Sequence, residues 1–281
     1  MLDPKCFDSI GFKAPDFQEF NRYIDTANLR GEHPTSERGR YTYWSVGDGI
    51  EVWSAFDKNQ RPMNNNPHYQ GSSRVKVQLL AMHDFSSTIE GILKLQTVPA
   101  TPGAPHPAFF CNMPSWDFAR PLLKAEAAKG GPVLFDLQLT AFAESLHCFP
   151  DEESFVTTEA ARQKELAEQA AVGIEHDTLI EPFWEPVQFL PSVLFSEDKK
   201  PLPKARIAGQ AERARILTNP VTKQQTLYLG VKTAGLTLDV VADPAIITGR
   251  PKHHGIVCGH FWLSGRLVPE IEATNKRLHI G

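Results

Sequence analysis

The alternation of apolar and polar residues predicts one short helical stretch at the start of the chain, followed by many strand-like runs. Within residues 16–29 the apolar side chains recur at intervals of three and four residues, which is the spacing of one helix face. These positions are Phe17, Phe20, Ile24 and Ala27. Asp16 and Glu19 stand three residues apart, as in a capping box, and Gly31 follows the last turn. The pattern predicts a helix that packs one face on a core.

Short alternating runs separated by turn residues then indicate antiparallel sheet. Residues 41–46 and 50–56 flank Gly47-Asp48-Gly49, a sequence typical of a tight hairpin. Turns are expected at Asn64–His68, where three amides precede a proline, and in the proline-rich residues 99–107. Further predicted strands are residues 74–82, 88–98 and 133–142.

The middle of the chain predicts a second helix and a connecting segment. Residues 158–172 are rich in Ala, Glu, Gln and Leu and precede Gly173, which fits a helix and its cap. Residues 181–195 contain prolines that forbid a long helix, yet their large apolar residues argue against a solvated linker. We expect this segment to lie extended over the body. The polar, proline-flanked residues 196–203 predict a domain boundary.

Beyond that boundary the pattern predicts a small β-module whose strand spacing resembles an OB-fold, with an SH3-like barrel or a plain meander left open. Its predicted strands are residues 205–218, 225–233, 236–242, 256–268 and 276–280. The predicted fold class is therefore α+β and β-rich: an antiparallel N-terminal sheet with flanking helices, followed by a small OB-like β-barrel module. The predicted division is an acidic β-rich region with an N-terminal helix (1–150), a helix and proline-rich connection (151–203), and a basic OB-like module (204–281).

Charge is distributed unevenly along the chain. Residues 200–281 hold 12 Lys and Arg against 5 Asp and Glu, whereas residues 1–199 hold 17 against 28. An asymmetry of this kind favours an anionic partner for the C-terminal part. The alternative is intramolecular, in that an acidic region docks a basic one.

The cysteines and the start of the chain indicate a cytoplasmic protein that does not enter a membrane. Cys6, Cys111, Cys148 and Cys258 are far apart and form no C-x-x-C pair, so a disulfide framework and a structural zinc site are not predicted. Residues 1–8 carry acids and a proline where a signal peptide needs a basic and then an apolar segment. The chain also lacks a run of about 18 apolar residues.

The predicted strand 256–268 carries the candidate ligand-binding residues. Alternation places Val257, Phe261 and Leu263 on a core face, and His260 with its alternate neighbours on the other. Adjacent strands add an aromatic, a cation and an acid to that second face. The predicted ligand-binding residues are Tyr228, Lys232, Asp239, His260, Trp262 and Arg266. An aromatic beside cations suits stacking and phosphate contact. The alternative is that Trp262 packs on the barrel end or on residues 182–195, and that Arg266 pairs with an acid of the other half.

Motifs for catalysis or metal binding are absent from the sequence. It contains neither a G-x-S-x-G elbow nor a glycine-rich phosphate loop. His253, His254, Cys258 and His260 are four possible metal ligands within eight residues, but paired ligand spacing is missing. We therefore predict no catalytic residue, no metal and no cofactor.

The sequence as a whole favours a non-enzymatic binding or interaction protein that acts through the exposed face of the C-terminal β-module. The expected partner is a protein or an anionic ligand. Two alternatives stay open: single-stranded nucleic-acid binding by the basic module, and a hydrolase-like enzyme whose residues converge only in three dimensions. For the enzyme, the candidates are His68, His83, Asp84 and His260.

Overall fold

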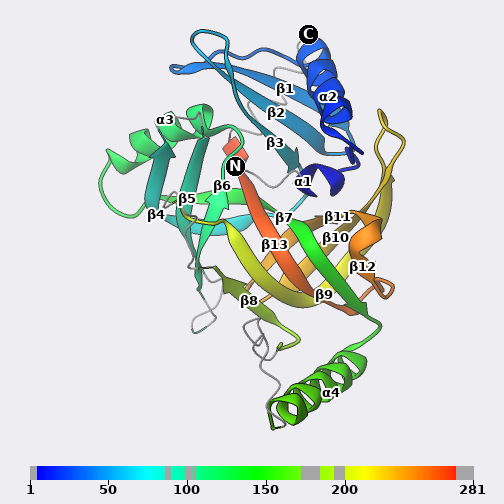
Figure 1. Cartoon of the computed structure of the whole chain (residues 1–281). Coiled ribbons are helices and arrows are strands. Elements are labelled where there is room, and N and C mark those ends of the chain that lie inside the picture. The colour runs from blue at the N-terminus through cyan, green and yellow to red at the C-terminus, as the bar shows by residue number, and fades with distance from the viewer. Residues whose placement is uncertain are drawn as a thin grey trace.

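The computed structural model describes residues 5–85, 90–98, 103, 106–171, 184–192 and 200–269 of the 281-residue chain. The fold is α+β and strand-rich, as the sequence predicted. Its strands form a three-stranded antiparallel sheet and a ten-stranded sheet. The small sheet and helix α2 lie on one side of the large sheet, and helix α4 projects from the opposite side (Figure 1).

The N-terminal sheet confirms the predicted hairpin. Strands β1 (Gly39–Gly47) and β2 (Ile50–Asp57) pair around a turn in which Asp48 and Gly49 have left-handed backbone angles of 49° and 82°. Such angles favour Asp and Gly in two-residue hairpin loops. The short helix α1 (Lys5–Asp8) precedes α2 (Phe17–Arg30).

The start of α2 follows from its capping residue. The carboxylate Oδ1 of Asp16 accepts a hydrogen bond from the backbone N–H of Glu19 at 2.8 Å, which satisfies one of the free donors of the first turn. Ala27 is buried against the small sheet, whereas Phe17 stays 76% exposed. The predicted helix is thus present, but its first apolar position does not join the core.

Residues 64–68 are a strand and not the turn that the sequence predicted. They belong to β3 (Pro62–Tyr69), which pairs with β2 and lies at the edge of the small sheet. A proline is tolerated in an edge strand because its missing N–H can face away from the partner strand. The side chains of Asn66 and His68 are buried and hydrogen-bonded, so their polarity does not signal a solvated loop.

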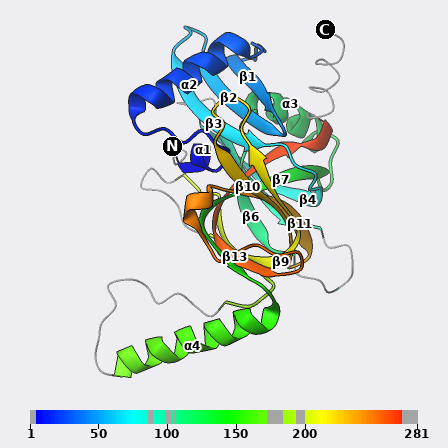
Figure 2. The same cartoon turned by 90° about the vertical axis from the view of Figure 1, so that its right-hand side faces the viewer.

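The large sheet closes on itself. The strands of this sheet are β4 (Val75–Phe85), β5 (Glu90–Thr97), β6 (Ala108–Asn112), β7 (Leu134–Phe149), β8 (Gln188–Pro191), β9 (Lys204–Thr218), β10 (Gln225–Thr233), β11 (Leu236–Ala242), β12 (Ile247–Thr248) and β13 (Ile256–Leu267). Starting from β9, the pairings run through β10, β11, β7 and β13 and return to β9. Figure 2 views this ring close to its axis. A second path, β4–β5–β6, also links β7 to β13, so the sheet is not a simple barrel.

The ring includes strands from both sides of the predicted domain boundary. Strands β9, β10, β11 and β13 match four predicted strands of the C-terminal module. Strand β7, from before residue 150, pairs in parallel with β11 and antiparallel with β13. The three-segment division stays a prediction, and the predicted strand 276–280 lies outside the described residues.

The middle segment contains a longer helix than expected. Helix α4 (Glu152–Ala171) starts six residues before the predicted helix, and Asp151 caps it by accepting the N–H of Ser154 at 2.8 Å. Strand β8 lies within the predicted extended segment and pairs with β9. The fold also contains helix α3 (Trp116–Ala127) and a 3-10 turn at Pro244–Ile246.

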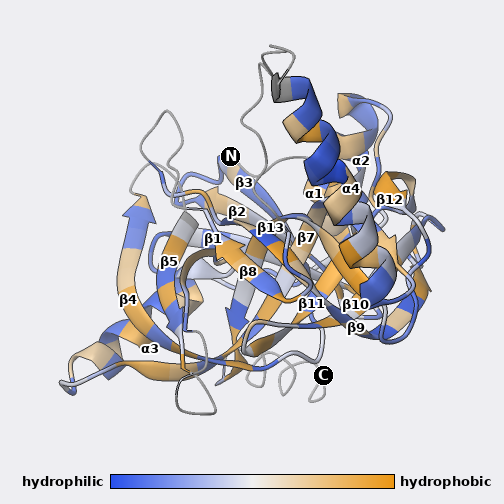
Figure 3. Ribbon diagram, turned by 90° about the horizontal axis from the view of Figure 1, so that it is seen from below, coloured by the Kyte–Doolittle hydropathy of each residue, from blue (hydrophilic) through white to orange (hydrophobic). Residues whose placement is uncertain are grey.

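The two largest of four apolar clusters among the described residues form the main cores of the fold. The first fills the interior of the large sheet and includes Leu93, Leu139 and Phe261. The second lies between the ring and the N-terminal elements and includes Phe12, Trp44 and other aromatic side chains. Figure 3 shows the ring strands β10 and β11 largely in hydrophobic colours, which agrees with strands buried on both faces.

Candidate functional site

Strand β13 is covered on both faces for most of its length. Its inward side chains, such as Phe261 and Leu263, lie in the core of the large sheet. On its outward face, Cys258 packs with Phe155 and Trp184, and Trp262 packs in the second core. Trp262 is only 7% exposed and is therefore not a free stacking surface.

Arg266 is fully buried in an ion pair with Glu51 of the small sheet. Its NH1 lies 2.8 Å from Oε1 and 3.0 Å from Oε2 of Glu51. The same carboxylate accepts hydrogen bonds from the hydroxyl of Tyr43 and the indole N–H of Trp53. The Arg266 guanidinium also lies 4.8 Å from the Trp53 ring centre. These four side chains join the small sheet to the large sheet. The ion pair agrees with the alternative in which Arg266 pairs with an acid of the other half of the chain.

His68 and Asp239 are connected by a second buried polar group, Gln138. The Gln138 Nε2 donates to Asp239 at 2.9 Å, so its Oε1 faces His68 and accepts from the ring Nε2–H at 2.7 Å. The Nδ1 of His68 accepts from the hydroxyl of Ser264 at 3.0 Å. Burial, as the main cause, lowers the pKa of His68 to about 4. His68 is therefore a neutral structural residue at neutral pH.

Asp239 is capped by the loop of residues 71–73. Its carboxylate accepts the backbone N–H groups of Ser72 and Ser73 at 3.3 and 2.9 Å, and the hydroxyl of Tyr228 at 2.8 Å. A Cβ on Gly71 would lie 2.1 Å from the Asp239 carboxyl carbon, so only glycine fits there. Tyr228 and Asp239 are brought together as predicted neighbours, but both are buried.

A cluster of exposed cations surrounds this capped carboxylate. We call it the basic face and define it as Arg74, Arg213, Arg215 and Lys232, all of which are exposed. The NH1 of Arg213 donates to the Ser72 hydroxyl at 2.7 Å.

The other cations of the basic face adjoin the same loop or the same strand. The NH1 of Arg74 donates to the carbonyl of Ser73 at 2.6 Å, and the Arg215 guanidinium lies 4.9 Å from the Tyr228 ring centre. On β10, Lys232 follows Tyr228 at an alternate position and therefore projects from the same side of the strand. Lys232 is thus the predicted site residue that remains exposed on this face.

The four cations of the basic face make no ion pair with an acid in the described part of the chain. The Asp239 carboxylate lies beneath the face, accepts hydrogen bonds from neutral groups and forms no ion pair with the four cations. Arg213 and Arg215 could have been found from the sequence, since they alternate on the predicted strand 205–218. Arg74 could not have been found from the sequence, because it joins the other cations only through the loop that caps Asp239.

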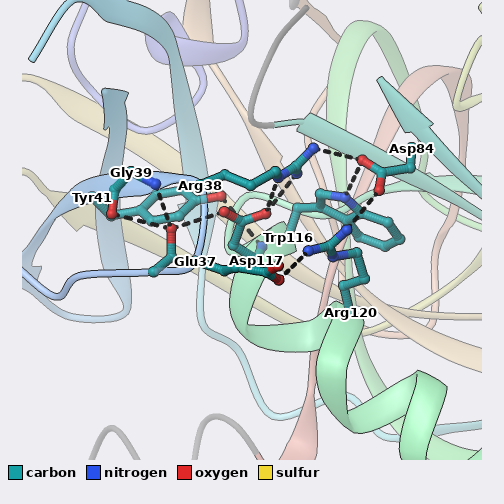
Figure 4. Close-up of polar contacts among 9 residues, drawn as sticks. Glu37, Arg38, Gly39, Tyr41, Asp84, Trp116, Asp117 and Arg120 are labelled. Atoms are coloured by element: carbon teal, nitrogen blue, oxygen red, sulfur yellow. Dashed lines mark hydrogen bonds and ion pairs between the residues drawn. The ribbon is translucent and has the colours of Figure 1, made fainter. Parts of the chain in front are cut away.

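Asp84, a candidate of the enzyme alternative, belongs to a network of charged residues between β4, α3 and the loop before β1 (Figure 4). Its carboxylate accepts from Arg38 NH1 at 2.7 Å, from Arg120 NH1 at 3.1 Å and from the Trp116 indole at 3.0 Å. Burial alone raises the pKa of Asp84, but the Trp116 hydrogen bond and the two arginine charges lower it overall. Arg38 also donates to Asp117 at 2.7 Å. These charged groups pair with one another across three elements, which is typical of a contact that holds a fold together.

The remaining enzyme candidates have separate surroundings. His83 lies edge-on to Phe110, with 5.7 Å between the ring centres. His260 is half-buried, and its Nδ1 lies 3.2 Å from the hydroxyl of Ser145. Neither histidine shares these contacts with His68 or Asp84, so the described residues do not assemble the four candidates into one site.

Three further features concern metal sites, cysteines and membrane helices among the described residues. They contain no group of three or more His, Cys, Asp or Glu placed to hold a metal ion. The four cysteines are buried free thiols. No described helix is both long and apolar enough to cross a membrane.

Comparison of the chain with protein-family models, curated proteins and solved structures finds no match.

Proposed function

We propose that this chain is a non-enzymatic binding protein that holds an anionic partner on its basic face. The observation that carries the proposal is the exposure of four cations on adjacent elements, without carboxylate partners among the described residues. Such a surface attracts anions over long range and neutralises phosphate or carboxylate groups on contact.

Two of the cations are held in place before a partner arrives. Arg213 donates a hydrogen bond to the Ser72 hydroxyl, and Arg74 donates to main-chain carbonyls of the same loop. Because their side chains are already ordered, less entropy is lost on binding. Arginine also presents a planar fork of donors that matches phosphate oxygens.

The chemistry of the face favours recognition of a charged backbone over stacking on bases. Trp262 is buried in the second core, and Tyr228 lies beneath Arg215. Stacking platforms are a usual part of single-stranded nucleic-acid sites. The partner that fits best is therefore an extended polyanion such as a nucleic-acid phosphate backbone, contacted by charge and without sequence preference.

Two further features belong to the proposal. An OB-like arrangement is supported by the number of strands in the closed path, since OB-folds are five-stranded and β9, β10, β11, β7 and β13 form such a set. A cytoplasmic setting is supported by four buried cysteines that remain free thiols.

Fluorescence anisotropy with the full chain and a labelled single-stranded oligonucleotide of about 20 nucleotides tests the proposal. If all four cations contact phosphates, the logarithm of affinity should fall with that of salt with a slope of about −2.8, which is a loss of about 50-fold between roughly 50 and 200 mM salt. The R213Q/R215Q variant should halve this slope.

The matched control is K58Q/R61Q, which removes two exposed cations at the opposite end of β3 from the capping loop. It should bind like the unaltered chain. Absence of binding at low salt, or equal loss in the two double variants, would remove the basic face as the site.

A further inference from the structure

The last part of strand β9 has a neighbouring strand on one side only. On its other side β13 pairs with β9 as far as Gln210, and the N–H of His254 donates to the carbonyl of Ala211. Glu212 is then the extra residue of a β-bulge against β10. Beyond this bulge, residues 213–218 pair only with β10 among the described residues. We call residues 213–218 the free edge.

The free edge carries main-chain donors and acceptors that face away from β10. In an antiparallel pair, every second residue directs its N–H and C=O to the partner strand, and the residues between direct theirs away. The hairpin closes with the N–H of Asn219 donating to the carbonyl of Gln224 at 2.9 Å, so the odd-numbered residues are those bonded to β10. The groups that face away therefore belong to Ala214, Ile216 and Thr218, all of which are exposed.

The side chains of the free edge differ between its two faces. Arg213 and Arg215 alternate on the face that carries Tyr228, and they belong to the basic face. Ala214 and Ile216 lie on the opposite face, where Ile216 is 55% exposed. A strand added to this edge would therefore meet cations on one face and apolar side chains on the other.

The charge of the free edge decides which kind of strand fits it. Antiparallel pairing with a second copy of this edge would bring Arg213 and Arg215 close to those of the other copy, and like charges on paired strands are destabilising. Charged side chains on a sheet edge commonly prevent such self-association. Acidic residues at the positions opposite the two arginines would instead stabilise the pairing.

We propose that the free edge binds an extended peptide by strand addition, and that acidic residues alternate with apolar residues in this peptide. The main chain of the peptide bonds the outward groups of Ala214, Ile216 and Thr218. Its carboxylates meet Arg213 and Arg215, and its apolar side chains pack beside Ile216. The inference goes beyond the polyanion proposed for the basic face, because it depends on main-chain hydrogen bonds and apolar contact that binding of a phosphate backbone does not require.

Fluorescence anisotropy with the full chain and a labelled peptide of about eight residues, in which Glu and Val alternate, tests the proposal. The control peptide has the same composition, but all its Glu residues precede all its Val residues. We expect the alternating peptide to bind at least about tenfold more tightly, because only its side chains match both faces of the free edge. Equal affinity of the two peptides would overturn strand addition.

Methylation of the peptide main chain separates hydrogen bonding from charge. Methyl groups on the N–H groups of all Val residues block one edge of the extended peptide, and methyl groups on those of all Glu residues block the other. One of these two peptides should lose at least about tenfold in affinity, and the other should bind like the unmethylated peptide. Equal affinity of the two methylated peptides would mean attraction by charge alone and would overturn the proposal.

Two substitutions of Ile216 locate the peptide on the chain. I216P removes an outward N–H, which an edge strand tolerates, and should weaken the alternating peptide at least about tenfold. The matched control I216T keeps this N–H and a branched side chain, and should bind the peptide within about threefold of the unaltered chain. Equal peptide affinity of I216P and I216T would contradict the location.

The peptide and the polyanion can fail separately. I216P keeps all four cations of the basic face, so it should retain the oligonucleotide affinity of the unaltered chain. Binding of the peptide without the oligonucleotide would refute the polyanion alone, and the reverse result would refute the peptide alone. A dimer of the unliganded chain that I216P dissociates would assign the free edge to a second copy and overturn the peptide.

Discussion

Several residues have roles that depend on neighbours far away in the sequence. Arg266 and Glu51 are 215 positions apart, and they form a buried ion pair that Tyr43 and Trp53 surround. The alternation of residues along β13 correctly predicted that Arg266 points away from the core of the large sheet. Alternation alone does not show whether that outer face is buried or exposed. Burial of the pair could not be read from the sequence, because it depends on the docking of the small sheet.

Gly71 offers a test of the loop that caps Asp239. G71A should destabilise the fold by about 2–4 kcal/mol, because its Cβ would overlap the Asp239 carboxylate and the loop must move away. The control is G230A on the neighbouring β10, where an added Cβ meets its nearest atom at an ordinary 3.6 Å. Urea unfolding measures both, and similar free energies of unfolding for the two variants would contradict the close approach.

His68 should make stability depend on pH. Its pKa is about 4 in the folded state and near 6.5 when unfolded, so the unfolded chain binds the extra proton first. The contribution is fully present above pH 6.5 and is lost as the pH falls toward 4, by up to about 3 kcal/mol. Between pH 4 and 6.5, the free energy of unfolding, measured with a chemical denaturant, should fall more steeply with decreasing pH for the unaltered chain than for H68Q. Parallel curves would exclude His68 as the cause.

Among the elements, β7 has the most consequences for the fold. It is 16 residues long and pairs with β4, β11, β12 and β13, so both closed paths of strands pass through it. The sequence predicted only residues 133–142 as a strand. Its remaining residues include Glu144, Ser145 and His147. These polar residues weaken the strand pattern in the sequence, and they occur because helices and loops cover this part of β7 only in part.

This role of β7 predicts the behaviour of an isolated C-terminal fragment. Residues 204–281 lack the strand between β11 and β13, so two strand edges stay unpaired and one side of the apolar interior is open. We expect the fragment to give a poorly dispersed amide NMR spectrum, while the full chain gives a dispersed one. A dispersed fragment spectrum would mean that the C-terminal strands form a ring unaided.

At the scale of the whole molecule, the strand-rich class and four C-terminal strands were predictable because alternation and turn residues are local signals. The ring closure was not, since it depends on pairing between segments far apart in the chain. The turn predicted at residues 64–68 was wrong for a related reason: Asn66 and His68 find buried partners on the other sheet. The candidate site was only partly predictable, because the outer face of β13 is covered by elements from elsewhere.

The shared strand also constrains how the protein is made. Strand β7 leaves the ribosome well before β13, from which it is separated by more than a hundred residues (Leu134–Phe149 against Ile256–Leu267). At usual translation rates, the edge of β7 that pairs with β13 waits about ten seconds for its partner. During that interval the unpaired edge of this strand is open to wrong pairing. We therefore expect the yield of native chain to respond to translation speed and chaperone supply more than to the stability of the finished fold.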